Sequence, residues 1–353
     1  MSNRIGELKA KLSQSNIDGM IVTNPVSVFY LTGLTAEGTL LITKQETVFI
    51  TDGRYIEEVN SRLTINDGII CYDYNDLTEE DDLNFFADCE KVGFEEKFVT
   101  YVDYSKFLVK YRIKELVEAS KFIEKQRMVK DETEIACIEK ACNITDSCFL
   151  HLLDFIKVGM TEKEIVAEIV YFFLQNGADG EAFETIVASG PNSSKPHAIP
   201  TDRKILPGDP ILIDFGAKYK GYCADMTRTI FAGQPSEEDA KLYEFLLAVQ
   251  KRAEFKIKDG ASGMEIAKGV EVELQARGYD LIHGLGHGVG IEIHEKPVLS
   301  HKVNWDLQEN NVVTCEPGIY IPGRIGIRIE DTVLVKKLES RSLTKSNKNL
   351  LTI

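Results

Sequence analysis

The stretch Ile211-Leu-Ile-Asp214-Phe-Gly-Ala-Lys-Tyr-Lys-Gly-Tyr-Cys-Ala-Asp225 contains two strand-forming runs around a turn, and it carries one aspartate in each arm. A turn centred between Tyr219 and Lys220 would place Asp214 directly opposite Asp225. Their Cβ atoms would then lie about 5 Å apart, unless a bulge shifts the register. Two carboxylates this close, inside apolar strands, favour a shared proton or a bound cation.

A second hairpin repeats this pattern of paired acids. The segment 312–316 ends in Glu316, a Pro322-Gly323 turn follows, and the segment 325–330 ends in Glu330. A turn centred on Gly323 places Glu316 opposite Glu330. One such pair could be chance, but two pairs predict four carboxylates around about two divalent cations.

Histidine is the other common ligand for such cations, and three of the six histidines lie in one glycine-rich stretch, 283–294. The four glycines of this stretch predict a loop or an irregular strand. It matches neither the helical His-Glu-x-x-His zinc motif nor the Gly-x-Gly-x-x-Gly phosphate loop. Outside this stretch, His197 taken in isolation is interpreted as a surface-loop residue and His151 as a structural residue. His301 is assigned no role.

The order of elements predicts an α+β catalytic region after a smaller α/β region. Residues 131–335 read as helix, helix, hairpin, twice over, with capping boxes at Asp131 and Thr161. The first 120 or so residues alternate strands and helices, and Phe29-Tyr-Leu reads as one of the strands. A charged stretch near 121–130 marks the boundary, so we expect domains at 1–125 and 126–353.

Composition narrows the function classes. Forty-one Lys and Arg against 56 Asp and Glu give a formal net charge of −15, which disfavours nucleic acid as a partner. The sequence has no run of 18 apolar residues, so no membrane span is predicted, and no apolar signal core follows Met1. Seven scattered cysteines are typical of free thiols in a reducing cytoplasm, so we expect a cytoplasmic protein.

Taken together, these residues resemble the five-ligand set of the pita-bread metallopeptidases, a group that includes methionine aminopeptidase, aminopeptidase P, prolidase and the metal-free creatinase. The matching positions, in chain order, are Asp214, Asp225, His287, Glu316 and Glu330. The aminopeptidase P and prolidase branch is resembled in particular, through the stretches 183–190, 286–290, 294–297, 316–318 and 328–331. An N-terminal creatinase-type domain is resembled at 24–33 and 52–55, so the resemblance covers nearly the whole chain.

The resemblance implies a pita-bread catalytic domain and two divalent ions per subunit, Mn(II) first and Co(II) or Zn(II) as alternatives. It also implies that Glu316 moves a proton, that His197 and His294 bind substrate, and that His283 assists proton transfer. Two further roles are implied for residues near the metals: Arg328 orients the carboxylates, and Phe183 lines the apolar pocket. Relatives of this kind are usually homodimers.

The implied activity is hydrolysis of Xaa-Pro bonds. In many prolidases an arginine that anchors the dipeptide carboxylate follows His-Glu-x-Pro, and here that position is Val298. We therefore expect an Xaa-Pro aminopeptidase, with an Xaa-Pro dipeptidase as the alternative. A non-catalytic peptide-binding module of the same fold is a remote third possibility.

Overall fold

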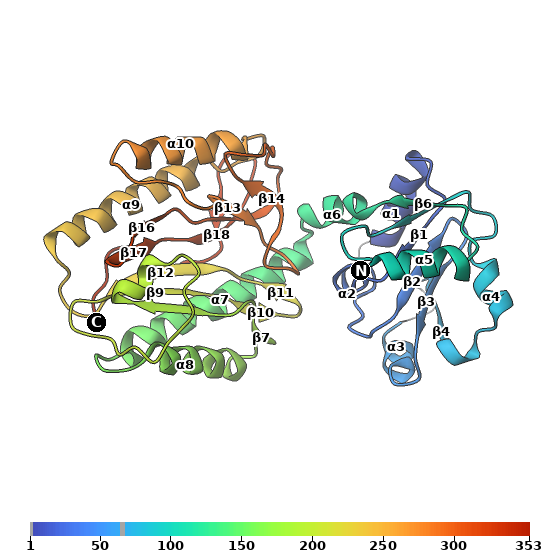
Figure 1. Cartoon of the computed structure of the whole chain (residues 1–353), viewed down its shortest axis with the longest axis horizontal. Helices are drawn as coiled ribbons and strands as arrows, with labels where there is room; N and C mark the ends of the chain where they lie inside the picture. Colours follow the sequence, from blue (N-terminus) through green and yellow to red (C-terminus); the bar gives the residue numbers. More distant parts are fainter. Residues whose placement is uncertain (1–2, 64–67) are drawn as a thin grey trace. The chain divides into compact units, whose positions relative to one another are not determined.

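The computed structural model describes residues 3–63 and 68–353 (Figure 1). The chain divides into two compact units, Met1–Arg127 and Met128–Ile353. No helix in the described ranges is long and apolar enough to cross a membrane. Each unit has its own core of buried apolar residues.

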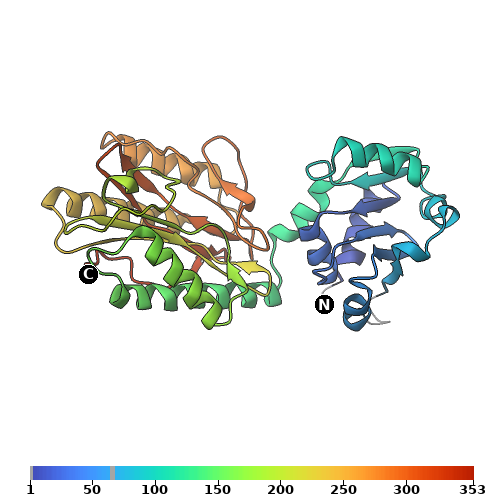
Figure 2. The same ribbon diagram turned by 60° about the horizontal axis from the view of Figure 1, so that its bottom comes forward.

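The first unit is built on one mixed six-stranded sheet, in the order β4-β3-β2-β1-β5-β6. Its strands pair antiparallel at β1/β2 and β2/β3 and parallel elsewhere (Figures 1 and 2). The elements are α1 (Arg4–Gln14), β1 (Gly19–Val22), α2 (Pro25–Thr32), β2 (Thr39–Thr43), β3 (Thr47–Thr51), α3 (Ile56–Arg62), β4 (Ile70–Asp73), the 3₁₀ turn η2 (Tyr74–Asp76), α4 (Glu79–Asn84), β5 (Lys91–Phe94), α5 (Tyr101–Lys110), β6 (Glu115–Glu118) and α6 (Ser120–Met128).

The strand predicted at Phe29-Tyr-Leu is wrong, because these residues lie in α2. Asn24 caps this helix by accepting a hydrogen bond from the Val26 N–H, and Pro25 occupies the first helical turn. Proline at that position loses no helical hydrogen bond and has the right φ already. The capping signal therefore outweighed the short apolar run.

The second unit contains four long helices in two consecutive pairs. They are α7 (Glu132–Phe155), α8 (Glu162–Gln175), α9 (Glu237–Lys256) and α10 (Gly263–Gln275). Capping boxes at Asp131 and Thr161 begin α7 and α8, which confirms both predicted helix starts. The pairs α7/α8 and α9/α10 lie on opposite sides of the strands (Figure 1).

Each helix pair is followed by strands, so helix, helix, hairpin occurs twice, as predicted. We call these the first half (131–235) and the second half (236–335), and the buried apolar residues form a separate cluster in each. The strands are β7 (Gly180–Glu181), β8 (Ile186–Ser189), β9 (Pro210–Phe215), β10 (Ala217–Tyr219), β11 (Tyr222–Cys223) and β12 (Met226–Phe231), then β13 (Gly286–Gly288), β14 (Glu295–Leu299), β15 (Val312–Cys315), β16 (Gly318–Ile321), β17 (Ile325–Arg328), β18 (Asp331–Leu334) and β19 (Arg341–Ser342); the 3₁₀ turn η3 (Gly190–Ser194) follows β8. With helices covering these sheets, the unit has an α+β architecture.

The register of the first hairpin differs from the prediction by two residues. Lys220 and Gly221 form the two-residue turn, both with positive φ, and Asp214 pairs with Thr227 instead of Asp225. Two positive φ values are typical of a type I′ turn, whose twist matches the flanking strands. Gly221, the glycine that takes positive φ, lies one residue beyond the turn residues that the prediction assumed. The turn, and with it the strand register, is therefore shifted.

The register of the second hairpin is confirmed. Cys315 pairs with Asp331 in one ladder and Gly318 pairs with Arg328 in the next. Glu316 and Glu330 therefore lie opposite each other, at the break between the two ladders.

Candidate metal centre

All the predicted site residues line one cavity of the second unit. Its volume is about 440 Å³. Apolar residues also line it, including Ile186, Ile293 and Val298. The lining also contains every predicted site residue: Phe183, His197, Asp214, Asp225, His283, His287, His294, Glu316, Arg328 and Glu330.

The four acids lie at or near strand ends. Asp214 pairs with Thr227 near the end of β9, and Asp225 lies between β11 and β12. Glu316 follows β15, and Glu330 precedes β18. Each hairpin thus delivers two carboxylates, and three of the four lie where a strand is interrupted.

The acids surround one imidazole at distances suited to a shared cation. His287 Nε2 lies 3.5 Å from Asp225 Oδ2 and 3.4 Å from Glu316 Oε1. One ligand atom each from Asp225, His287 and Glu330 lie within 4.8 Å of one another. Carboxylate oxygens with a single imidazole are a ligand set that suits hard divalent ions such as Mn²⁺.

Burial and mutual repulsion shift the pKa values of this group. Burial first, and then the neighbouring acid Glu330, raises the pKa of Asp225 well above its usual range. Burial, and then Glu316, does the same to the pKa of Glu330, while burial raises the pKa of Glu316 to about 8. Burial, and then His294, lowers the pKa of His287 to about 4, so this imidazole is neutral and able to bind a metal.

Among the described residues that line the cavity, one guanidinium, that of Arg328, is the positive charge available to balance these acids. Arg328 donates from Nη2 to Asp214 Oδ2 at 2.6 Å, but the Asp214 Oδ1 atom is buried and has no hydrogen-bond partner among the described residues. An unpartnered buried carboxylate oxygen is costly. A divalent cation fits this arrangement, because it would satisfy that oxygen and offset the repulsion among the acids.

Two residues that the sequence analysis did not single out connect the predicted ones. Thr227 accepts a hydrogen bond from Arg328 Nε at 3.0 Å and donates one to Glu330 Oε2 at 2.6 Å. The Tyr320 hydroxyl accepts from Arg328 Nη1 at 2.6 Å and lies 3.0 Å from His283 Nε2. The signal in the sequence for Tyr320 was its spacing of four residues from Glu316, because alternate residues of an extended chain lie on one face.

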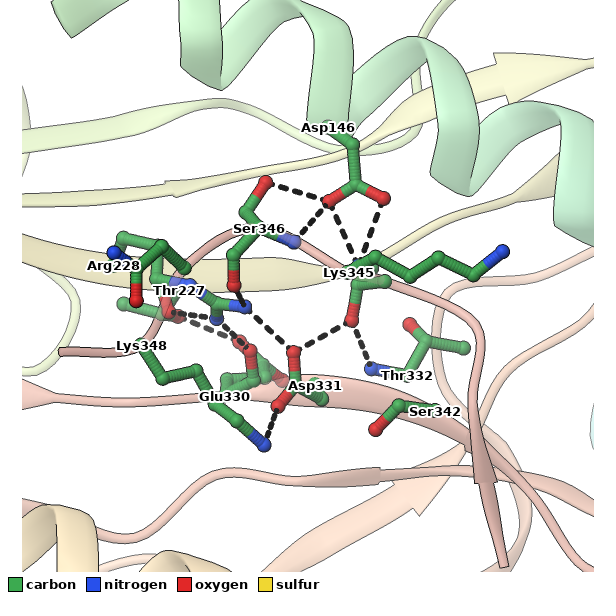
Figure 3. A network of polar contacts seen from close by, with 12 residues as sticks. Asp146, Thr227, Arg228, Glu330, Asp331, Thr332, Ser342, Lys345, Ser346 and Lys348 are labelled. Atoms are coloured by element: carbon green, nitrogen blue, oxygen red, sulfur yellow. Dashed lines mark hydrogen bonds and ion pairs between the residues drawn. The ribbon is translucent and has the colours of Figure 1, made fainter.

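A network of charged side chains next to Glu330 connects this acid to the C-terminal segment (Figure 3). Arg228 donates to the Glu330 carbonyl oxygen, to Asp331 Oδ1 at 2.7 Å and to the Ser346 carbonyl oxygen at 2.8 Å. The Lys348 ammonium lies 2.6 Å from Asp331 Oδ2. Three of these contacts thus hold Glu330 and its neighbour Asp331, and the fourth joins Arg228 to Ser346.

The remaining histidines surround the acids. His294 stacks edge-on against His287, with ring centroids 4.4 Å apart, and His283 Nδ1 lies 4.0 Å from Glu316 Oε2. His197 follows η3 in an exposed turn and still reaches the cavity. Val298, paired with His287 across β13 and β14, occupies the wall.

A pita-bread fold with four buried acids and a neutral imidazole defines a divalent-metal hydrolase. The model of Metallopeptidase family M24 matches residues 136–337, and that of the Creatinase/Prolidase N-terminal domain matches residues 4–129. The chain therefore belongs to metallopeptidase family M24, and it carries the N-terminal domain found in its creatinase and prolidase members. The family binds divalent metal ions, in agreement with the chemistry of the site.

Relatives and solved structures match along nearly the full length. An Xaa-Pro dipeptidase of Pyrococcus furiosus is 35% identical over 357 residues, which cover 99% of this chain and 100% of the relative. The structure of an Xaa-Pro dipeptidase from Bacillus anthracis has a TM-score of 0.94 at 36% identity and covers 99% of both chains. That of an X-Pro aminopeptidase from Thermotoga maritima has a TM-score of 0.89 at 32% identity and covers 97% of this chain and 100% of its own.

Proposed function

We propose that the chain is an Xaa-Pro dipeptidase, which hydrolyses the bond before proline in a dipeptide. The observation that carries the proposal is the cavity in which four acids, His287 and the apolar wall meet. The dipeptidases of P. furiosus and B. anthracis support the dipeptide as substrate. They favour this reading over the aminopeptidase that the sequence analysis put first.

We assign the role of metal ligand to five residues, the four acids and His287. We expect two ions, with Mn(II) as the first choice. Bound divalent ions supply Lewis acidity and lower the pKa of bound water toward neutrality. We assign Glu316, which lies beside His287 and His283, to the transfer of a proton from the attacking water to the leaving nitrogen. Arg328 fixes the orientation of Asp214. The assigned ligands are Asp214, Asp225, His287, Glu316 and Glu330.

The rest of the cavity is assigned to substrate binding. We assign His197 and His294, which both line the cavity, to hydrogen bonds with the peptide and with charge that develops on its carbonyl. His283, held by Tyr320, assists proton movement near Glu316. Phe183 contributes apolar surface to the wall.

A dedicated cavity suits the chemistry of the Xaa-Pro bond. Its nitrogen carries no hydrogen, and the ring fixes φ near −65°. A peptidase that binds its substrate as an added β-strand loses a backbone hydrogen bond at this residue. An apolar cavity that accepts the ring replaces that contact with burial.

Val298 favours the second candidate, an Xaa-Pro aminopeptidase. This residue lines the cavity at a position where a carboxylate-binding arginine occurs in many prolidases. An apolar side chain there offers no ion pair to the C-terminal carboxylate of a dipeptide. A peptide that continues past proline would not need that ion pair.

The test compares Ala-Pro with Ala-Pro-Ala as substrates in the presence of Mn²⁺. A higher kcat/KM for Ala-Pro supports the dipeptidase, and a higher value for Ala-Pro-Ala supports the aminopeptidase. Ala-Ala controls for the requirement for proline, and His287→Ala controls for the metal site. Turnover of Ala-Pro by His287→Ala at the wild-type rate would overturn both candidates. We also propose a homodimer, which light scattering tests directly.

A further inference from the structure

Glu162, the first residue of α8, is a completely buried carboxylate that is not one of the proposed metal ligands. Its relative exposure is 0%, and none of the described cations forms an ion pair with it. Its charge is instead satisfied by hydrogen-bond donors. Oε1 accepts from the Ser189 N–H at 2.6 Å and the Ser189 hydroxyl at 2.9 Å, and Oε2 accepts from the Thr201 N–H and hydroxyl, both at 2.8 Å.

A third residue, Asn192, donates its side-chain amide to both oxygens, at 3.2 and 3.0 Å. Ser189 ends β8, Asn192 lies in η3, and Thr201 follows the turn that carries His197. One carboxylate therefore holds the start, the middle and the end of the segment 189–201. Its three contacts bracket the exposed histidine that reaches the cavity.

The opposite side of this segment is held by β17. The Gly326 N–H donates to Ser193 Oγ at 2.8 Å, and Arg328 Nη1 donates to the Pro196 carbonyl oxygen at 3.2 Å. A Cβ atom on Gly326 would lie 1.9 Å from the Ser193 carbonyl oxygen, so only glycine permits this approach. The segment is thus clamped between Glu162 and the strand that carries Arg328.

We propose that Glu162 is a positioning residue that fixes the 189–201 segment, and with it His197, against the substrate cavity. This inference rests on the proposed function, in which His197 contacts the peptide. Six hydrogen bonds to one buried carboxylate restrict a segment that otherwise ends in an exposed turn. Ordering that turn before substrate binds lowers the entropic cost of forming the contact.

The first experiment is a double-mutant cycle on kcat/KM for Ala-Pro and Ala-Pro-Ala, with Glu162→Gln and His197→Ala. Glutamine keeps the shape, but its amide group faces donors that need an acceptor. We expect Glu162→Gln to lower kcat/KM at least about tenfold in the wild type, and less than about threefold in the His197→Ala background. Glu164→Gln is the matched control, because Glu164 lies exposed in the same helical turn and bonds only to Thr161.

The second experiment measures hydrogen–deuterium exchange and needs no activity. We expect faster amide exchange in residues 189–203 of Glu162→Gln, with the exchange of α7 and α9 unchanged. If this variant does not fold, Thr201→Val is measured in the same way. It removes the hydroxyl that donates to Glu162 Oε2 and that accepts from the Arg203 N–H, so a smaller increase is expected, read at residues 189–200.

The outcomes separate this inference from the proposed function. If wild-type protein cleaves no Xaa-Pro substrate, the proposed function fails, and exchange alone decides whether Glu162 orders the segment. If cleavage occurs but the losses in the cycle are additive, Glu162 does not act through His197 and the inference is overturned. Unchanged exchange in residues 189–203 of a folded Glu162→Gln protein would overturn it as well.

Discussion

Arg328 and Asp214 form an ion pair that uses only one side of the carboxylate. The Arg328 Nη2 atom donates to Asp214 Oδ2 at 2.6 Å, and the other oxygen is buried and unpartnered among the described residues. The guanidinium also contacts Thr227 and Tyr320. Its planar fork therefore presents one oxygen of Asp214 to the place where a cation would bind.

Replacing Arg328 with lysine should lower kcat/KM about tenfold to a hundredfold, because a single ammonium cannot contact Asp214, Thr227 and Tyr320 together. Steady-state kinetics with saturating Mn²⁺ measure this loss. Arg324→Lys is the control, since Arg324 lies in the same hairpin and pairs with the exposed Glu238. Equal activity of the two variants would contradict the positioning role of Arg328.

Metal binding should release protons at neutral pH. The pKa of Glu316 is raised to about 8, and burial and repulsion raise those of Asp225 and Glu330 well above their usual range, so the metal-free acids hold protons that the unfolded chain would lose. A raised carboxyl pKa lowers the stability of the metal-free fold as the pH rises from about 4.5 toward 8. Metal affinity should rise over the same window.

Calorimetric titration of Mn²⁺ at pH 7 in two buffers of different ionisation enthalpy measures this release. We expect roughly one proton or more per subunit. Glu316→Gln should release fewer protons than the wild type. Identical heats in both buffers would show that the acids are already ionised, contrary to the expectation.

Removing the Lys348 ammonium should destabilise the second unit. This group lies 2.6 Å from Asp331 and 2.7 Å from Glu254, both largely buried (Figure 3). Lys348→Met leaves the Asp331 charge with Arg228 as its remaining cation. Because Lys348 is about one-fifth exposed, we expect a loss of about 2 kcal/mol in the free energy of unfolding, measured by urea denaturation.

Lys345→Met is the matched control for this change. The Lys345 side chain is exposed, and only its backbone N–H contacts Asp146, a contact that the substitution keeps. A Lys348→Met protein as stable as Lys345→Met would show that the network contributes little.

Introducing a guanidinium at Val298 should favour dipeptides. We expect Val298→Arg to raise the ratio of kcat/KM for Ala-Pro over Ala-Pro-Ala at least about tenfold, since an added ion pair to the free carboxylate benefits only the shorter substrate. Val298→Met, of similar length without charge, is the control. A ratio that stays the same in Val298→Arg would mean that the dipeptide carboxylate lies elsewhere.

Much of the site followed from the sequence, because strand alternation and turn chemistry constrain a hairpin strongly. Gly323 fixed the second turn, and the predicted opposition of Glu316 and Glu330 is confirmed. The predicted register of the first hairpin was wrong because Lys220, a residue without special turn preference, takes positive φ beside Gly221. A local pattern does not say which non-glycine residue will adopt that conformation.

Other features depended on contacts distant in sequence. Glu162 reads as an ordinary acid in the first turn of a helix, where negative charge is favoured anyway. Its partners lie 27 to 39 residues away, so only the folded chain shows its role. Thr227 likewise became informative only once the corrected register placed it opposite Asp214.

The acids at the ladder breaks donate their backbone N–H groups across the molecule instead of along their own hairpins. The Glu330 N–H bonds to the Thr227 carbonyl in the first half, and the Asp225 N–H bonds to the Thr332 hydroxyl in the second. Each half therefore accepts a backbone hydrogen bond from a proposed metal ligand of the other. The proposed reaction centre is built from both halves, and neither half alone carries all the residues assigned to it.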